Sequence, residues 1–388
     1  MKNLIGLVLA HHVTNYGALL QAYAVQTAVE SLGFSTKIID YKSHKFQRGI
    51  KFDFGIVAWL WDSLKSKYSK KKFNQTPLDE IHLNNKRNRK LRFNEFNTEM
   101  LHNIEVFNGI DALRNSAKNC KGVLIGSDQM WLPGVSFGNY QSLRFVPKGV
   151  RRISYATSLG VSKYPKYCYR SAKDMWKNID FLSVREEQGK AIINDIAPDL
   201  NVEVVLDPTY LFSKDEWEKR IPIKRMTEEK YVLCYFLGNS ESQQKMAQEF
   251  CNRKGLKCYS ILSDESISAI DTTFPDKVIT GGSAQDFVNW IRGAEYIITD
   301  SFHGLAFSVI NEKQFFVFYR QRIDHKPNRN SRINNILSKF NCQSRLITND
   351  QTNIPDINPI NYNEVSEILS DLRSKSWRFL KNALTFKE

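Results

Sequence analysis

The sequence predicts an α/β protein in which two Rossmann-like domains face a cleft. One observation is the opening β-α-β pattern, with β runs at residues 2–10 and 36–40 and a helical repeat at 18–31 between them. Another is a fresh alternation of strands and helices from residue 231 onward. Connections of this kind join parallel strands, so each half of the chain is expected to form one parallel sheet.

A third observation is the stretch 293–312, which holds a short β-branched run, a polar turn and a helical repeat. The turn reads Asp300-Ser301-Phe302-His303-Gly304. A helix that starts there presents unpaired N–H groups and a partial positive charge, which suit an anion. His303 adds a group that titrates near neutral pH. In the competing interpretation, Asp300 or Ser301 only caps the helix and His303 is structural.

These patterns divide the chain into three parts. Residues 1–222 form the first domain and residues 223–360 the second, because a charged, irregular stretch at 213–229 indicates a linker. Residues 361–388 contain an amphipathic helix that is expected to pack back across the first domain. Polar turns follow the predicted strands of the first domain at residues 15–17, 126–131, 157–160, 185–189 and 207–209. Open α/β sheets bind ligands at this edge.

Composition and charge narrow the class of protein. The six cysteines of the 388 residues are scattered without a C-x-x-C pair, which disfavours a zinc site or disulfide framework and favours a reduced, cytoplasmic setting. No apolar run reaches the roughly 18 residues that a membrane span needs. A net charge of +14 favours acidic partners. Nucleic acid is disfavoured because no known binding module accompanies the charge.

An insertion of basic and aromatic character is expected at about residues 43–97. Residues 56–68 show helical spacing and carry two tryptophans, and a lysine cluster follows at 65–72. A second basic run spans 86–92. Such a segment is typical of a helix that meets the anionic inner face of the cytoplasmic membrane as a peripheral contact. An ordinary surface helix with a solvated basic end explains the pattern equally well.

Six stretches, in this order, resemble the polysaccharide pyruvyl transferase family. They are residues 15–24 (NYGALLQAYA), 126–131 (GSDQMW), 154–160 (SYATSLG), 183–186 (SVRE), 205–209 (VLDPT) and 299–304 (TDSFHG). The resemblance implies a GT-B-like fold with the active site in the cleft. It implies transfer of pyruvate from phosphoenolpyruvate onto two hydroxyls of a sugar, in a cell-surface polysaccharide or its lipid-diphosphate-linked precursor. No metal and no cofactor beyond the donor is expected.

The resemblance also assigns residues to the phosphoenolpyruvate donor. Arg185 matches the family arginine for the donor anion, and its alternative is a surface ion pair with a neighbouring glutamate. His303 matches the family histidine and is expected to act as general acid or phosphate ligand, beside Gly304. Many members carry arginine where this chain has Ser301. Arg320 or Arg322 is therefore expected to supply the missing charge.

The first-domain loops are expected to bind the acceptor. Asp128 is the candidate catalytic carboxylate that orients or deprotonates a sugar hydroxyl, and Gln129 lies beside it. Asn15, Tyr16 and Gly17 complete the acceptor side. In the alternative interpretation, Asp128 and the 15–17 loop only cap turns, as Asp207 is expected to do before Pro208.

Two other functions stay open at this point. A glycosyltransferase that uses a nucleotide-sugar donor would share the architecture, and a basic cleft would suit its diphosphate. A non-catalytic binding module in polysaccharide assembly is the second alternative. It is disfavoured because Arg185 and His303 both lie at strand ends, where active sites of α/β sheets form.

Overall fold

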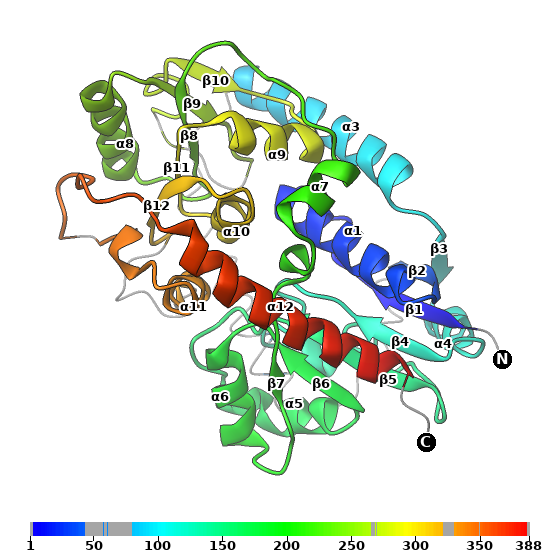
Figure 1. The fold of residues 1–388 in the computed structure, drawn as a ribbon. Coiled ribbons are helices and arrows are strands. Elements are labelled where there is room, and N and C mark those ends of the chain that lie inside the picture. Colours follow the sequence, from blue (N-terminus) through cyan, green and yellow to red (C-terminus); the bar gives the residue numbers. More distant parts are fainter. Residues whose placement is uncertain are drawn as a thin grey trace.

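The computed structural model describes residues 3–42, 57, 60, 80–264, 268, 270–320, 330–348 and 350–385. Within them the chain forms two parallel sheets with helices between successive strands (Figure 1), which confirms the predicted α/β class. Apart from residues 57 and 60, which are helical, the predicted helix at 56–68 lies outside the described residues, as do its lysine cluster and Arg322. Among the helices of the described part, none is both long and apolar enough to cross a bilayer.

The first sheet has seven strands in the order β3-β2-β1-β4-β5-β6-β7. Every adjacent pair is parallel. Val8, Ile39 and Ile125 are among the buried side chains of its inner strands, as expected for β-branched runs covered on both faces. The strands are β1 (Leu4–Val8), β2 (Ser35–Lys42), β3 (Ile104–Asn108), β4 (Gly122–Ile125), β5 (Arg151–Thr157), β6 (Phe181–Val184) and β7 (Glu203–Val204).

The second sheet has six strands in the order β10-β9-β8-β11-β12-β13, again all parallel. The strands are β8 (Tyr231–Tyr235), β9 (Lys257–Ile261), β10 (Lys277–Ile279), β11 (Tyr296–Thr299), β12 (Gln314–Phe318) and β13 (Leu346–Ile347). The chain order reverses between β8 and β11, and ligands of open α/β sheets bind beside such a switch point. The 300–304 turn directly follows β11.

Helices cover both sheets. They are α1 (Tyr16–Ser31), α3 (Glu80–Met100), α4 (Ile110–Ala117), α5 (Tyr169–Trp176), α6 (Glu187–Ile196), α7 (Lys214–Arg220), α8 (Glu241–Lys254), α9 (Ala284–Gly293), α10 (Phe302–Ile310), α11 (Ser331–Lys339) and α12 (Tyr362–Thr385). No element is predicted from the sequence at the positions of β3, β10, β13, α3, α4, α5, α6 and α7. The last of these forms in the predicted linker, where Ser213 and Glu216 make a capping box.

The closing helix α12 crosses from the second sheet back over the first, as predicted (Figure 1). Its Ser376 hydroxyl accepts a hydrogen bond from the Leu206 N–H at 3.0 Å. The Trp377 indole donates to the Leu211 carbonyl at 3.0 Å. These bonds tie α12 to the segment that follows β7, so the C-terminal helix stabilises the first sheet.

The helix α3 joins the two halves. The N–H of Gly281 donates to the Asn85 Oδ1 at 2.8 Å, and the Arg89 guanidinium donates to the Leu262 carbonyl. Leu262 and Gly281 follow β9 and β10 of the second sheet, whereas α3 precedes β3 of the first. Arg89 is only 2% exposed and lies 4.8 Å above the Tyr16 ring. The central arginine of the basic 86–92 run is therefore a contact between the halves, not part of a surface charge patch.

Candidate active site

A cavity of about 420 Å³ lies between the carboxyl-end loops of the two sheets. The first half supplies residues 9, 10 and 12–15 after β1, residues 128–130 and 132 after β4, and Tyr140 and Gln141. The second half supplies Leu237 after β8, residues 300–303 after β11, and Arg320 and Arg332. Of the polar turns predicted in the first half, those at 15–17 and 126–131 supply lining residues, whereas those at 157–160, 185–189 and 207–209 do not line the cavity.

The 300–304 turn is built by hydrogen bonds within the second half. The Ser301 hydroxyl accepts from the Gly304 N–H at 3.2 Å and so caps α10. The Asp300 carboxylate instead accepts from the Leu237 and Gly238 N–H groups, at 2.6 and 2.7 Å. Ser301 is thus the cap, and Asp300 joins the ends of β8 and β11. The positive end of α10 faces the cavity.

His303, in the first turn of α10, lines the cavity and reaches into the first half of the molecule. Its Nε2 lies 3.8 Å from Oδ2 of Asp207 and has no hydrogen-bond partner among the described residues. The Phe302 ring stands edge-on to the imidazole, with centroids 5.0 Å apart. A Cβ on Gly17 of α1 would lie 1.9 Å from Nδ1. Only glycine at position 17 therefore leaves room for this imidazole.

Asp207 is the centre of a buried polar cluster. Its Oδ2 accepts from Nη1 of Arg185 at 2.7 Å and from the Ser127 hydroxyl at 2.8 Å. Its Oδ1 accepts from the N–H and the hydroxyl of Thr209, at 3.0 and 2.7 Å. Burial alone would raise the pKa of Asp207, but the adjacent His303 and Arg185 outweigh burial and hold that pKa well below its usual range. A permanent carboxylate therefore lies beside the imidazole.

Arg185 does not line the cavity. Its side chain is 2% exposed, and Nε donates to the Glu186 carboxylate at 3.0 Å while Nη1 binds Asp207. The guanidinium carbon lies 4.0 Å from the centre of the Phe302 ring. Burial lowers the pKa of Arg185, yet the two carboxylates outweigh burial and raise it. Arg185 and His303 thus meet at a shared carboxylate behind the cavity wall, and two carboxylates already neutralise the guanidinium.

Two other arginines line the cavity, both from the second half. Arg320 follows β12, and Arg332 lies in the first turn of α11. With the Gln129 amide in its hydrogen-bonding orientation, its oxygen accepts from Nη1 and Nη2 of Arg332 at 2.9 and 3.2 Å. The Arg332 guanidinium also lies 5.9 Å from the centre of the Phe302 ring. This pairing places an arginine of one half against the loop of the other.

The loop after β4 holds Asp128 in a left-handed conformation, with φ of 74°. Its carbonyl accepts from the N–H groups of Met130 and Ser158, at 2.7 and 2.9 Å, which fixes that conformation. Residues other than glycine adopt this left-handed backbone conformation at a cost of about 1–3 kcal/mol, and residues strained in this way cluster at functional sites. Gly160 lets Gln129 approach, because a Cβ there would lie 2.9 Å from a terminal atom of the Gln129 amide.

Of the three residues predicted to bind the acceptor in the loop after β1, only Asn15 lines the cavity. Asn15 also caps α1, since its Oδ1 accepts from the Gly17 N–H at 2.9 Å. Tyr16 is buried between the halves, where its ring stacks on Phe287 at 4.8 Å and its hydroxyl donates to the Gly282 carbonyl at 3.0 Å. Tyr16 joins the two halves and does not face the cavity.

Comparison with known proteins identifies the family. The sequence model of the polysaccharide pyruvyl transferases matches residues 15–322. The chain belongs to the polysaccharide pyruvyl transferase family. It is therefore an enzyme of this kind, and the predicted resemblance is confirmed. No protein with a curated description matches the sequence.

Solved structures similar to this family member are distant in sequence. One described as a UDP-N-acetylglucosamine 2-epimerase from Listeria monocytogenes has a TM-score of 0.48 at 10% identity, over 99% of this chain and 91% of that chain. The UDP-GlcNAc 2-epimerase from Neisseria meningitidis gives 0.43 at 10%, over 100% and 95%. The E. coli heptosyltransferase WaaC gives 0.39 at 9%, over 95% and 99%.

The structure brings most of the predicted site residues of this pyruvyl transferase to one cavity. Lining residues are Asn15, Asp128, Gln129, Ser301, His303 and Arg320, whereas Arg185, Tyr16, Gly17 and Gly304 lie behind its wall. Sequence reasoning missed Arg332, His12 and the contact of Asp207 with His303. Asp207 and His12 each follow a strand, and that position is a signal in the sequence, but nothing local distinguishes Arg332 among the polar residues at the start of α11.

Proposed function

We propose that this enzyme transfers pyruvate from phosphoenolpyruvate onto two hydroxyls of one sugar in a polysaccharide or its lipid-linked precursor, with release of phosphate. The observation that carries the proposal is the meeting of His303, Arg320 and Arg332 in one cavity at the positive end of α10. Two guanidinium groups and a helix terminus suit a small donor with a carboxylate and a phosphate. Family membership supplies the reaction class.

The chemistry needs one acid and a place for two anionic groups. A proton is added to the methylene carbon of the enol phosphate, and one sugar hydroxyl attacks the oxocarbenium-like centre that results. The C–O bond to phosphate then breaks, and the second hydroxyl closes the ketal ring. Of the two hydroxyl protons, one replaces the proton given to carbon and the other leaves with phosphate. We assign the acid to His303, because it lines the cavity and its Nε2, 3.8 Å from Oδ2 of Asp207, has no hydrogen-bond partner among the described residues.

Arg185 acts on the donor indirectly in this proposal. Its charge is already shared between Glu186 and Asp207, so its role is to hold the Asp207 carboxylate in place beside His303. Arg320 and Arg332 bind the donor anion, and Ser301 shapes the helix terminus. In this proposal Arg332 joins Arg320 in supplying the positive charge that was expected from Arg320 or Arg322.

The acceptor sugar is proposed to bind on the side of Asn15, Asp128 and Gln129, which line the cavity from the first half. We further propose that a lipid diphosphate carries it at the inner face of the membrane. The exposed side of α3 supports a peripheral contact, because it presents Lys86, Arg87 and Lys90 together with the 56% exposed Leu91. Liposome co-sedimentation with anionic lipid tests this part separately, and no binding by the intact chain would refute it.

The test of the reaction is mass spectrometry of candidate glycans incubated with the full chain and phosphoenolpyruvate. An added pyruvyl group and stoichiometric phosphate are expected, whereas UDP release from a UDP-sugar would favour a glycosyltransferase. His303→Ala should abolish transfer. His102→Ala is the matched control, since His102 also pairs with a carboxylate, Glu30 at 2.7 Å, but lies on the surface. Normal turnover by His303→Ala would refute the assignment of the acid.

A further inference from the structure

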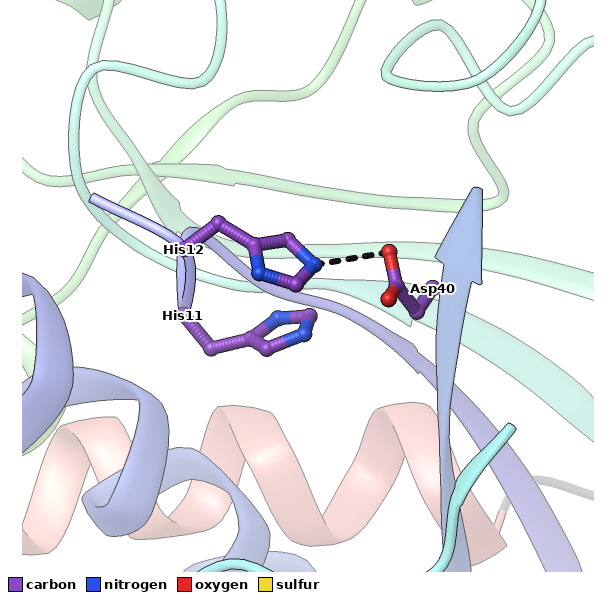
Figure 2. Close-up of side chains that lie close together, drawn as sticks. All are labelled: His11, His12 and Asp40. Carbon is purple, nitrogen blue, oxygen red and sulfur yellow. Dashed lines mark ion pairs between the residues drawn. The ribbon is translucent and has the colours of Figure 1, made fainter. Parts of the chain in front are cut away.

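Three side chains of types that commonly bind metals lie close together beside the cavity, at the ends of β1 and β2. Figure 2 shows the rings of His11 and His12 one above the other, both pointing toward Asp40. One ligand atom from each residue lies within 4.8 Å of the other two. The ring centroids are 4.0 Å apart, and Nε2 of His12 is 2.7 Å from Oδ1 of Asp40. The parallel register that pairs Leu7 with Ile38 brings these two strand ends together.

Among the three side chains, His11 gives the strongest evidence for a ligand site. It is 2% exposed, and its Nδ1 lies 3.2 Å from the Leu9 carbonyl oxygen. A carbonyl only accepts, so Nδ1 carries the proton and Nε2 keeps its lone pair. That Nε2 is buried and has no hydrogen-bond partner in the described part of the chain. Histidines that bind metals are commonly held in this way, with the other nitrogen bound to a backbone carbonyl.

We propose that His11, His12 and Asp40 bind one divalent ion of the zinc class. Two imidazole nitrogens and a carboxylate oxygen are ligands that suit zinc, and three protein ligands leave a fourth position open. A tetrahedral ion with bonds of about 2.0 Å spaces its ligands by about 3.3 Å, so His12 and Asp40 need to separate by only about 0.6 Å. The ion takes the place of the proton between them.

The position of the site connects it to the cavity. His12 lines the cavity, and its side chain is 62% exposed, whereas Asp40 is 7% exposed and His11 is buried. The ion would therefore lie at the edge of the cavity with its deeper ligands fixed and one ligand able to adjust. Its open position suits an oxygen of water or of an anion. This inference does not depend on phosphoenolpyruvate being the donor.

The test uses the full chain without an affinity tag, after treatment with a chelator and dialysis. Titration with Zn²⁺ by calorimetry should give one ion per chain, and Co²⁺ should give the visible absorption of a four- or five-coordinate site. His12→Ala and Asp40→Asn should each weaken binding at least tenfold. His102→Ala is the matched control, because the His102–Glu30 pair has the same 2.7 Å distance but belongs to no three-ligand cluster in the part of the chain that the structure describes.

The outcomes separate clearly. One ion bound by the native chain and by His102→Ala, and lost in His12→Ala, supports the site. No stoichiometric binding, or binding unchanged in both His12→Ala and Asp40→Asn, overturns it and leaves His12 and Asp40 as an ion pair. His12 is exposed, so His12→Ala is expected to fold, and unchanged thermal unfolding in the absence of metal checks this.

Discussion

Replacement of Gly17 by alanine tests the position of His303, the proposed acid, without changing the imidazole itself. The new Cβ would lie 1.9 Å from Nδ1 and 2.1 Å from Cγ of His303. Normal contacts between such atoms are about 3.5 Å, so the imidazole or α1 must move by roughly 1.5 Å. A misplacement of about 1 Å costs on the order of 100-fold in rate. We therefore expect Gly17→Ala to lower kcat at least 100-fold.

The higher helix propensity of alanine should stabilise α1, whereas the clash with His303 should lower turnover, so stability and activity report on different effects of this change. Gly17 lies in the first turn of α1, and alanine favours a helix over glycine by up to about 1 kcal/mol. Overpacking costs about 1–3 kcal/mol, so the net change in unfolding free energy stays within roughly 2 kcal/mol. Phosphate release and thermal unfolding measure the two effects. Gly189→Ala is the matched control, since its Cβ fits at 3.4 Å from Leu159. Wild-type turnover by Gly17→Ala would refute the placement of His303.

Two further predictions concern charge at the site. Asp207→Asn should lower the free energy of unfolding by about 3 kcal/mol, measured in urea, because it breaks a buried ion pair with Arg185. The pKa of Asp207 is lowered in the folded protein, so its stabilisation is complete above the ordinary pKa of about 4 and is lost as pH falls below it. The difference in unfolding free energy between wild type and Asp207→Asn should therefore decrease in acid, and a difference that stays constant would contradict this reasoning. Arg332→Gln should raise KM for phosphoenolpyruvate at least tenfold, since a charge-assisted hydrogen bond contributes about 1.5–3 kcal/mol. The exposed Arg225→Gln serves as its control, and an unchanged KM in Arg332→Gln would remove Arg332 from the donor site.

Most of the strands could be predicted because their signals are local, and so could the turn that follows β11. Residues 296–299 are predicted as a strand from a β-branched apolar run, and the structure has β11 at Tyr296–Thr299. The capping box of α7 was also a local signal, Ser213 followed by Glu216, but the surrounding charges obscured it. Local sequence patterns therefore predict most of the elements, and a local pattern was also present for α7, which was not predicted.

The roles of Arg89, Arg185 and Arg332 depend on contacts between distant segments. Arg89 lies in a basic run that is typical of a solvated face, but its contacts with the Leu262 carbonyl and with Oδ2 of Asp264 at 3.6 Å, both in the other half, bury it. Arg185 is predicted as an anion ligand, but Asp207, 22 residues later, neutralises it. No periodicity or motif encodes such pairings, because they form only when separate loops pack together.

The contacts of Tyr16 and α3 have a consequence for how substrates enter. Tyr16 stacks on Phe287, and Asn85 and Arg89 bind the segments after β9 and β10, so several contacts hold the two halves together beside the cavity. Rigid-body rotation would have to break these bonds together. Admission of a donor is therefore expected to rely on local rearrangement of loops. X-ray scattering should give the same radius of gyration with and without phosphoenolpyruvate.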